Sequence, residues 1–299
     1  MTTVIQTKNV SKRYKAVAAV DELSVEFEQH RIHGLLGRNG AGKTTLMQLL
    51  TGQLFATGGQ ISVFGEEPVE NADVLRRVCF IQEGQVYPDG FTPEHVLTVA
   101  RGIHSGWDEE TARHLVDVFE LPTDRKIKKL SRGQLSAIGI IVGIASRAEL
   151  TFFDEPYLGL DAVARKNFYD ELLRDFSEHP RTIVISSHHI DEIAPLLETV
   201  TVIDNGKLLM RHEVEELADA ASSFSGTRTA IDEFAEYVEV LERTDVGGLS
   251  TIVVRGQVPR PLLERASELK LERQPASLQD LFVALTESAR QERRARQNA

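Results

Sequence analysis

An eight-residue segment, Gly37-Arg-Asn-Gly-Ala-Gly-Lys-Thr44, constrains the fold of this chain more than any other feature of its sequence. It fits the pattern G-x-x-x-x-G-K-[ST], follows the apolar run Arg31–Leu36 and opens a stretch with leucines at helical spacing that ends near Thr51. In this context the glycines let successive backbone N–H groups point at phosphate oxygens, and the helix adds its positive N-terminal end. The segment therefore predicts a phosphate-binding loop in an α/β fold.

The loop ends in two side chains suited to nucleotide chemistry. Lys43 would place a positive charge on the β- and γ-phosphates, and the hydroxyl of Thr44 would ligate Mg²⁺. The residues expected to contact the nucleotide here are Gly37, Arg38, Asn39, Gly40, Ala41, Gly42, Lys43, Thr44 and Thr45.

A pair of carboxylates follows a second apolar run. Glu149–Phe153 reads as a buried strand, and Asp154 and Glu155 come directly after it. Asp154 would hold Mg²⁺ through a hydrogen-bonded water, and Glu155 would orient or deprotonate the water that attacks the phosphate. The two runs together predict a site that both binds and hydrolyses a nucleoside triphosphate.

Five further segments occur in a fixed order around these two. They are Val10-Ser-Lys-Arg-Tyr14, Leu130-Ser-Arg-Gly-Gln134, Tyr157-Leu-Gly-Leu-Asp161, Ser186-Ser-His188 and Asp204-Asn-Gly-Lys207. With them, residues 4 to 212 resemble the ATP-binding cassette (ABC) ATPases, whose signature is LSGGQ. A phosphate loop alone would indicate only a nucleotide binder.

The resemblance implies a role for each matching residue. Ser131, Gly133 and Gln134 would bind the γ-phosphate of a nucleotide held by a second cassette, and Asp161 would shape that interface. His188 would hydrogen-bond the γ-phosphate and help Glu155 hold the water, so that Glu155, His188 and Lys43 form the expected catalytic set. Tyr14 would stack on the adenine ring. ATP would then join two cassettes, and its hydrolysis would release them.

Two positions depart from the family pattern. Arg132 stands where the signature has its first glycine, although Gly133 is kept. The glutamine that would meet the magnesium ion falls in the segment that holds Gln82, Glu83 and Gln85; Gln82 or Glu83 is preferred as a metal contact, and the sequence does not decide between them.

The alternation of strands and helices up to about residue 212 favours a largely parallel sheet. The expected fold is an α/β P-loop NTPase of ABC type with an antiparallel β-layer and a helical subdomain at about 84–145. Residues 213–226, with the turn-rich run Ser222–Gly226, are expected to form a linker. Residues 227–299 are expected to form a small α+β extension of unknown role.

Composition restricts the partners and the location. Among the 299 residues, 45 acidic side chains face 34 basic ones, and this net charge of −11 disfavours nucleic acid as a partner. The single cysteine excludes an internal disulfide. The longest uncharged, mostly apolar run, Leu135–Ala145, is shorter than the ~20 residues that span a bilayer, and the first residues lack a signal-peptide core. We therefore expect a cytoplasmic chain that reaches the membrane through a partner.

The leading functional hypothesis is the ATP-binding subunit of an ABC transporter. It would use ATP and Mg²⁺, pair with a second cassette (an identical copy or a paralogue) and drive a separate transmembrane permease. The tail Ala276–Thr286 resembles that of export-type cassettes. Two alternatives remain: a non-transport ABC ATPase acting on the ribosome or DNA, and a regulatory nucleotide-binding module. The residues that contact the transported substrate belong to the membrane subunit, so this sequence does not identify the substrate.

Overall fold

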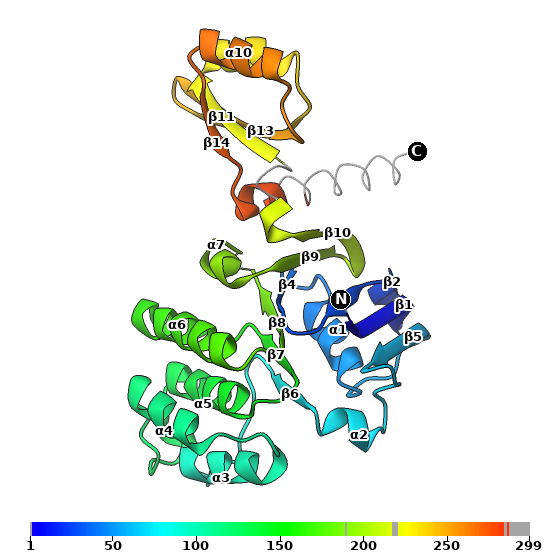
Figure 1. Cartoon of the computed structure of the whole chain (residues 1–299), viewed down its shortest axis with the longest axis vertical. Coiled ribbons are helices and arrows are strands. Elements are labelled where there is room, and N and C mark those ends of the chain that lie inside the picture. Colours follow the sequence, from blue (N-terminus) through cyan, green and yellow to red (C-terminus); the bar gives the residue numbers. More distant parts are fainter. Residues whose placement is uncertain (1, 189, 217–220, 284–285, 287–299) are drawn as a thin grey trace. The chain divides into compact units, whose positions relative to one another are not determined.

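The computed structural model describes residues 2–188, 190–216, 221–283 and 286. The chain divides into two compact units, the first formed by residues 1–188 and 203–208 and the second by residues 189–202 and 209–299. Every helix in the described ranges is too short or too polar to traverse a lipid bilayer. Figure 1 labels helices and strands of both units.

The first unit begins with an antiparallel layer. Its strands are β1 (Thr3–Tyr14), β2 (Val17–Leu23), β3 (Glu26–Glu28) and β5 (Gly58–Val63). Strand β1 pairs with all three of the other strands, β2, β3 and β5. Tyr14 is the last residue of β1, at the hairpin where it pairs with Val17 of β2.

A six-stranded sheet follows, in which four neighbouring strands pair in parallel. Its strands are β4 (Ile32–Leu36), β6 (Val78–Ile81), β7 (Leu150–Asp154), β8 (Thr182–Ser187), β9 (Thr199–Asp204) and β10 (Lys207–Glu213), in the order β10-β9-β4-β8-β7-β6. Strands β4, β7 and β8 are buried along their whole length, which is why they read as continuous apolar runs rather than alternating ones. The pairings Leu36↔Ser187 and Asp154↔Ser186 align the carboxyl ends of β4, β7 and β8 at one edge.

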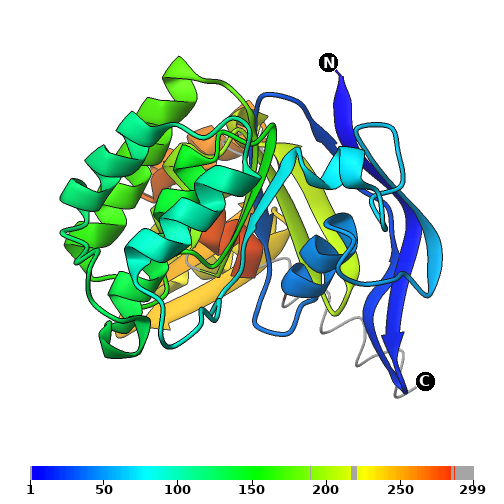
Figure 2. The same ribbon diagram turned by 90° about the horizontal axis from the view of Figure 1, so that it is seen from below.

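Helices pack on this sheet. They are α1 (Lys43–Leu50), α2 (Ala72–Leu75), α3 (Pro93–Ile103), α4 (Glu109–Val118), the 3₁₀ turn η1 (Ile127–Lys129), α5 (Arg132–Ala145) and α6 (Ala162–Glu178). In Figure 2 the antiparallel layer lies on one side of the parallel strands, and α3 to α6 lie on the other. Helix α5 lies against the sheet closely enough that a Cβ at Gly143 would be 2.4 Å from the ring of Phe153. This confirms the predicted α/β fold with an antiparallel layer.

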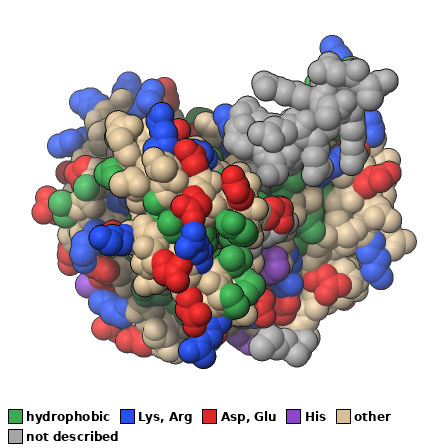
Figure 3. Space-filling model, turned by 90° about the horizontal axis from the view of Figure 1, so that it is seen from above, with side chains coloured by type: hydrophobic (Ala, Val, Ile, Leu, Met, Phe, Trp, Pro, Cys, Tyr) green, Lys and Arg blue, Asp and Glu red, His purple; other side chains and the backbone are tan. Residues whose placement is uncertain are grey.

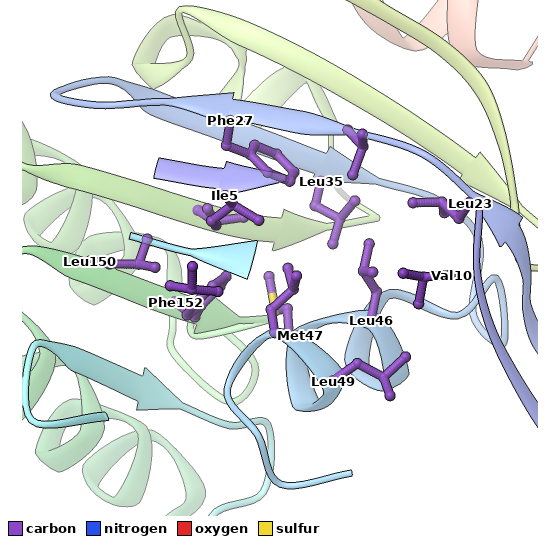
Figure 4. Packing of buried hydrophobic residues seen from close by; sticks show 14 of the residues in the cluster. Ile5, Val10, Leu23, Phe27, Leu35, Leu46, Met47, Leu49, Leu150 and Phe152 are labelled. Carbon is purple, nitrogen blue, oxygen red and sulfur yellow. The ribbon is translucent and has the colours of Figure 1, made fainter. Parts of the chain in front are cut away.

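The core of the first unit joins the two sheets. Figure 4 shows α1 between them, with Leu46 and Leu49 facing the antiparallel layer and Met47 facing Phe152 of β7. All of these side chains are fully buried. Helix α1 is therefore fixed by apolar contacts on both sides, so its N-terminus holds a set position at the edge of the parallel sheet.

The second unit contains a four-stranded antiparallel sheet. Its elements are α7 (Ile190–Ile193), η2 (Ala194–Leu196), β11 (Ala221–Thr227), α9 (Arg228–Ala235), β12 (Val240–Val246), β13 (Leu249–Arg255), α10 (Arg260–Glu268) and β14 (Glu272–Pro275). The βαββαβ succession from β11 to β14, with strand order β12-β13-β11-β14, is the split-βαβ arrangement of ferredoxin-like domains. Its core includes Phe224, Phe234 and Ile252.

The run Ser222–Gly226, predicted as a turn-rich part of a linker, instead belongs to β11, a central strand of this sheet. Its small polar residues are accommodated because β13 and β14 pair with both of its sides and satisfy its backbone groups. Phe224 anchors the strand in the core, and Gly226 leaves room for Leu271, whose Cδ2 would lie 2.4 Å from an added Cβ. The C-terminal tail beyond Val283 lies almost wholly outside the described residues.

Candidate functional site

The phosphate loop connects β4 to α1 and is shaped by close backbone contacts. Gly42, the residue before α1, has φ of +106°, and a Cβ there would lie 2.3 Å from the carbonyl oxygen of Ala19. On the other side of the loop, the N–H of Gly206 donates to the carbonyl of Ala41 at 2.8 Å. The turn at 204–207 therefore holds the loop in place. Arg38, Asn39 and Gly40 form its exposed tip, and Thr45 follows within α1, half-buried.

Lys43 is buried under this loop. Its ammonium group donates to the carbonyl of Gly37 at 2.7 Å and to that of Arg38 at 3.4 Å. It also lies 3.3 Å from Oε1 of Glu155. A buried ammonium group is costly unless opposite charge surrounds it, so the loop is suited to an anion that brings its own oxygens.

Thr44 and Asp154 meet across the edge of the sheet. The Thr44 hydroxyl donates to Asp154 Oδ2 at 2.6 Å, and Ser186 donates to Asp154 Oδ1 at 2.6 Å. Asp154 is fully buried. Both carboxylate oxygens are therefore oriented by hydroxyl groups, one from α1 and one from β8.

Glu155 follows in the left-handed backbone region, with φ of +48°, which L-residues rarely adopt. Its N–H donates to Ser186 Oγ at 2.9 Å. Its Oε2 accepts hydrogen bonds from the Tyr157 hydroxyl at 2.5 Å and from His188 Nδ1 at 2.8 Å. The turn after β7 thus directs the carboxylate toward Lys43 and His188.

Three neighbours set the charge of Glu155. Burial would raise its pKa, but the hydrogen bonds from Tyr157 and His188 and the positive charge of Lys43 outweigh that effect and hold the pKa below its usual value. The carboxylate is therefore ionised at neutral pH. Its Oε1 atom is buried and accepts no hydrogen bond, and it faces the Lys43 ammonium at 3.3 Å.

The signature-like and D-loop-like segments serve as helix caps. Ser131 caps α5 and exchanges hydrogen bonds with Gln134, and Asp161 caps α6 through the N–H of Ala164. A Cβ at Gly133 would lie 2.8 Å from the carbonyl oxygen of Gly159, so the two segments touch at that point. Within the described residues, the side chains of Ser131, Gln134 and Asp161 make no hydrogen bond to the phosphate loop. In a single chain, these three side chains are therefore not hydrogen-bonded to the phosphate loop.

Tyr14 and the residues after β6 line the approaches to the site. Tyr14 is half-exposed at the end of β1, with the Lys12 ammonium 5.2 Å from its ring centroid. Gln82, Glu83 and Gln85 all line one groove of about 690 Å³, which Glu155 also borders. Because all three line the same groove, each of them is still a candidate for the residue that would contact a metal ion.

Sequence reasoning missed Tyr157, Ser186 and Ser187. Tyr157 was noted only as the first residue of a D-loop-like segment, and the two serines only as neighbours of His188. Their placement depends on the register Asp154↔Ser186 between β7 and β8, which a single sequence does not show. The signal was the position of the serines at the end of a β-rich run, where parallel strands bring side chains together.

The sequence is similar to those of known proteins. A family model described as ABC transporter matches residues 20–158. The chain is 36% identical to the bacitracin transport ATP-binding protein BcrA of Bacillus licheniformis, over 70% of this chain and 69% of that protein. It is 30% identical to the Nod factor export ATP-binding protein I of Burkholderia pseudomallei, over 94% of this chain and 96% of that protein.

Solved structures show the same fold. The ATP-binding subunit of an ABC transporter superposes with a TM-score of 0.64 at 21% identity, over 72% of this chain and 91% of that one. A dimeric ATP-binding cassette in a post-hydrolysis state with ADP and Pi gives a TM-score of 0.62 at 19% identity, over 70% of this chain and 98% of that one.

Proposed function

This chain belongs to the ABC transporter ATP-binding protein family, and we propose that it hydrolyses ATP between two cassettes to drive export through a separate membrane subunit. Its membership makes it an ATP-binding subunit with ATPase activity coupled to transport. We propose in addition the direction of transport, the partners and the role of each residue.

The observation that carries the proposal is the meeting of four side chains at one edge of the sheet. Lys43 and Thr44 come from the phosphate loop, and Asp154 and Glu155 come from the end of β7, more than 100 residues later. The loop offers backbone N–H groups and a buried cation to an anion, and the turn after β7 offers an ionised carboxylate to a water. Such a set suits hydrolysis of a phosphoanhydride better than binding alone.

In this proposal Lys43 leaves the carbonyl of Gly37 to contact the β- and γ-phosphates, while Gly37–Thr45 surrounds them. Glu155 Oε1 accepts a proton from the attacking water, and His188 orients the γ-phosphate and that water. Thr44 and Asp154, whose oxygens already lie 2.6 Å apart, fit the oxygen ligands that Mg²⁺ prefers, with Gln82 or Glu83 near them. Bound there, Mg²⁺ would neutralise charge that develops on the phosphates.

A second cassette completes the site. Ser131, Gly133 and Gln134, at the N-terminus of α5, would contact the γ-phosphate held by the partner cassette, because a helix N-terminus attracts anions. Asp161 would shape the contact between cassettes, and Tyr14 would stack on adenine. The dimeric fold neighbour supports this arrangement. Whether the second cassette is a copy or a paralogue is left open.

Export and a membrane partner are supported by the relatives. A relative that this chain matches over 94% of its length is named for Nod factor export, and that match includes most of the second unit. The net charge is −11, and Figure 3 shows acidic and basic side chains interspersed on the face in view. This charge pattern disfavours a nucleic-acid partner. We place the chain at the cytoplasmic face of the membrane, bound through its permease.

We also propose a division of the chain. Residues 1–212 would form the cassette, with a helical subdomain at about 84–145, and the C-terminal extension would begin with β11 at Ala221 rather than at residue 227, because β11 is a central strand of its sheet. The break between α3 and α4 and the long buried helix α5 support a helical subdomain.

Replacement of Glu155 tests the proposed chemistry. The purified full chain should hydrolyse ATP with Mg²⁺, and Glu155→Gln should bind ATP, stop turnover and accumulate as an ATP-bound dimer on size-exclusion chromatography. Glu149→Gln is the matched control, since Glu149 precedes the same strand at its opposite end and pairs with Arg77. Normal turnover by Glu155→Gln would remove Glu155 from its role.

Transport direction needs the membrane subunit. The chain should co-purify with a polytopic membrane protein encoded beside it, and inside-out vesicles that contain both should take up substrate only with ATP. Uptake by right-side-out vesicles instead would indicate import. Co-purification of ribosomal RNA or DNA would favour a non-transport cassette ATPase.

A further inference from the structure

Tyr157 lies in the turn after β7 and is fully buried. Its ring lies beside His188, with centroids 6.5 Å apart, and Arg165 lies over its face at 5.7 Å. Its hydroxyl lies 2.5 Å from Glu155 Oε2 and 2.5 Å from Ser187 Oγ. A tyrosine hydroxyl therefore occupies the interior of the site, between the carboxylate and β8.

The direction of these hydrogen bonds follows from which groups carry a proton to donate. An ionised carboxylate only accepts, so the one proton of the Tyr157 hydroxyl points to Glu155 Oε2. Ser187 must then donate its own proton to the tyrosine oxygen. The resulting chain runs from Ser187 through Tyr157 to Glu155, and it ties the carboxylate to β8.

The hydroxyl keeps its proton. Burial, and next the neighbouring charge of Glu155, raise the pKa of Tyr157 well above its ordinary range. Tyr157 is therefore a donor at every pH at which the protein functions.

The two oxygens of Glu155 are consequently unequal. Oε2 carries two hydrogen bonds, from Tyr157 and His188, whereas the buried Oε1 accepts none and has only the Lys43 ammonium facing it, at 3.3 Å. The side chain of His188 is 30% exposed and is open to competition from a ligand, while Tyr157 is sealed in the interior. The anchor that persists when the site is filled is thus the tyrosine.

We propose that Tyr157 is a positioning residue that fixes Glu155 by its Oε2 atom and leaves Oε1 as the oxygen that takes the proton of the attacking water. The proposal rests on the proposed function, because it assigns Glu155 to the hydrolytic step. It predicts an effect on turnover rather than on nucleotide binding, since Tyr157 contacts the carboxylate and the phosphate loop holds the nucleotide.

Tyr157→Phe tests this, because it removes one oxygen and keeps the buried ring. A hydrogen bond to a charged group contributes enough that kcat should fall by about tenfold to a hundredfold, with KM for ATP within about twofold. Ser187→Ala should lower kcat by less, since it leaves the hydrogen bond from Tyr157 to Glu155 in place. Tyr237→Phe, which removes an exposed hydroxyl in the second unit, should leave kcat unchanged.

A second measurement separates positioning from support of the fold. The double variant Tyr157→Phe with Glu155→Gln should still form the ATP-dependent dimer, and Tyr157→Phe should unfold at the wild-type temperature within a few degrees. Loss of ATP binding and thermal stability together with kcat would overturn the proposal in favour of a structural role.

The outcomes also separate this inference from the proposed function. If Tyr157→Phe keeps kcat within twofold while Glu155→Gln stops turnover, the positioning role is wrong and the function of Glu155 stands. If Glu155→Gln itself turns over normally, the assignment of Glu155 fails and this inference fails with it.

Discussion

The hydroxyl of Thr44 donates a 2.6 Å hydrogen bond to Oδ2 of Asp154, which lies 110 positions later in the chain. This contact joins the first turn of α1 to the end of β7. It exists because α1 is packed on both sides by the core and because β7 pairs in parallel beside β8, which in turn pairs with β4. The core thus sets the distance between the two oxygens that we assign to Mg²⁺.

Thr44→Val tests whether the Thr44 hydroxyl contributes to binding of Mg²⁺. Valine keeps the shape of threonine but removes the hydroxyl, so Asp154 Oδ2 loses its donor and the metal loses one oxygen. We expect ATP turnover to fall by about tenfold or more and the Mg²⁺ concentration for half-maximal activity to rise. A steady-state ATPase assay over a Mg²⁺ titration measures both quantities.

The control is Thr51→Val, at the other end of the same helix. The Thr51 hydroxyl donates to the carbonyl of Met47 within α1 and makes no contact with the site. Its replacement should leave the Mg²⁺ dependence unchanged. An unaltered Mg²⁺ requirement in Thr44→Val would remove Thr44 from the metal site.

Gly42→Ala should destabilise the chain more than Gly40→Ala. Both glycines have positive φ, but a Cβ at Gly42 would lie 2.3 Å from the Ala19 carbonyl oxygen, whereas the space beside Gly40 is open. We expect a loss of about 1 kcal/mol for Gly40→Ala, from backbone strain, and of about 2 to 5 kcal/mol for Gly42→Ala, from strain and overlap. Urea unfolding at pH 7 gives both values; equal losses would contradict the steric argument.

The carboxylates and the phosphate loop could be placed from the sequence because each ends or follows a strongly apolar run. Parallel strands that are buried on both faces have such runs, and their carboxyl ends share an edge. For this reason the meeting of Lys43, Thr44, Asp154 and Glu155 needed no knowledge of strand order.

The hydroxyl groups around the carboxylates could not be placed in the same way. Ser186 and Ser187 reach Asp154 and Tyr157 only because β8 lies beside β7 in one particular register. The strand β11 was missed for a related reason: its serines and glycine have low β-propensity, and pairing with β13 and β14 overrides it. Both are properties of neighbours that are distant in sequence.

Cys79, the only cysteine of the chain, should resist alkylation in the folded state. Burial raises its pKa to about 11, so only about one molecule in a thousand is a thiolate at pH 8, against roughly a quarter for a free thiol with pKa near 8.5. Iodoacetamide at pH 8 should react at least about a hundredfold more slowly with the native chain than with the chain in urea. Mass spectrometry of timed samples measures this ratio, and similar rates would show that β6 opens readily.

Asp108 should contribute stability that acid removes. It caps α4, and the hydrogen bond from the Thr111 N–H, with a further contribution from Arg147 at 2.9 Å, lowers its pKa. A lowered pKa means that the contribution is complete above the unfolded value near 3.9 and is lost as the pH falls through the folded value. Asp108→Asn keeps a capping side chain but should lose about 1 kcal/mol at pH 7, and this difference should shrink as the pH falls below the unfolded pKa.

Urea unfolding at several pH values between 7 and 3 tests this dependence. Asp117→Asn, an exposed position on the same helix, serves as the control and should track the wild-type curve at each pH. A constant difference between Asp108→Asn and wild type across the range would mean that the charge of Asp108 contributes nothing.

Phe224→Ala should unfold the ferredoxin-like sheet selectively. Phe224 is fully buried at the centre of β11, and its ring centroid lies 4.7 Å from that of Phe234 on α9. Removal of a large buried aromatic side chain costs about 3 to 5 kcal/mol, a large share of the stability of so small a core. Hydrogen exchange followed by mass spectrometry should show loss of protection in β11, β13 and α9, while α1 and β7 stay protected because their core contains no residue of this cluster. Loss of protection in α1 and β7 to the same extent would mean that the two units unfold as one.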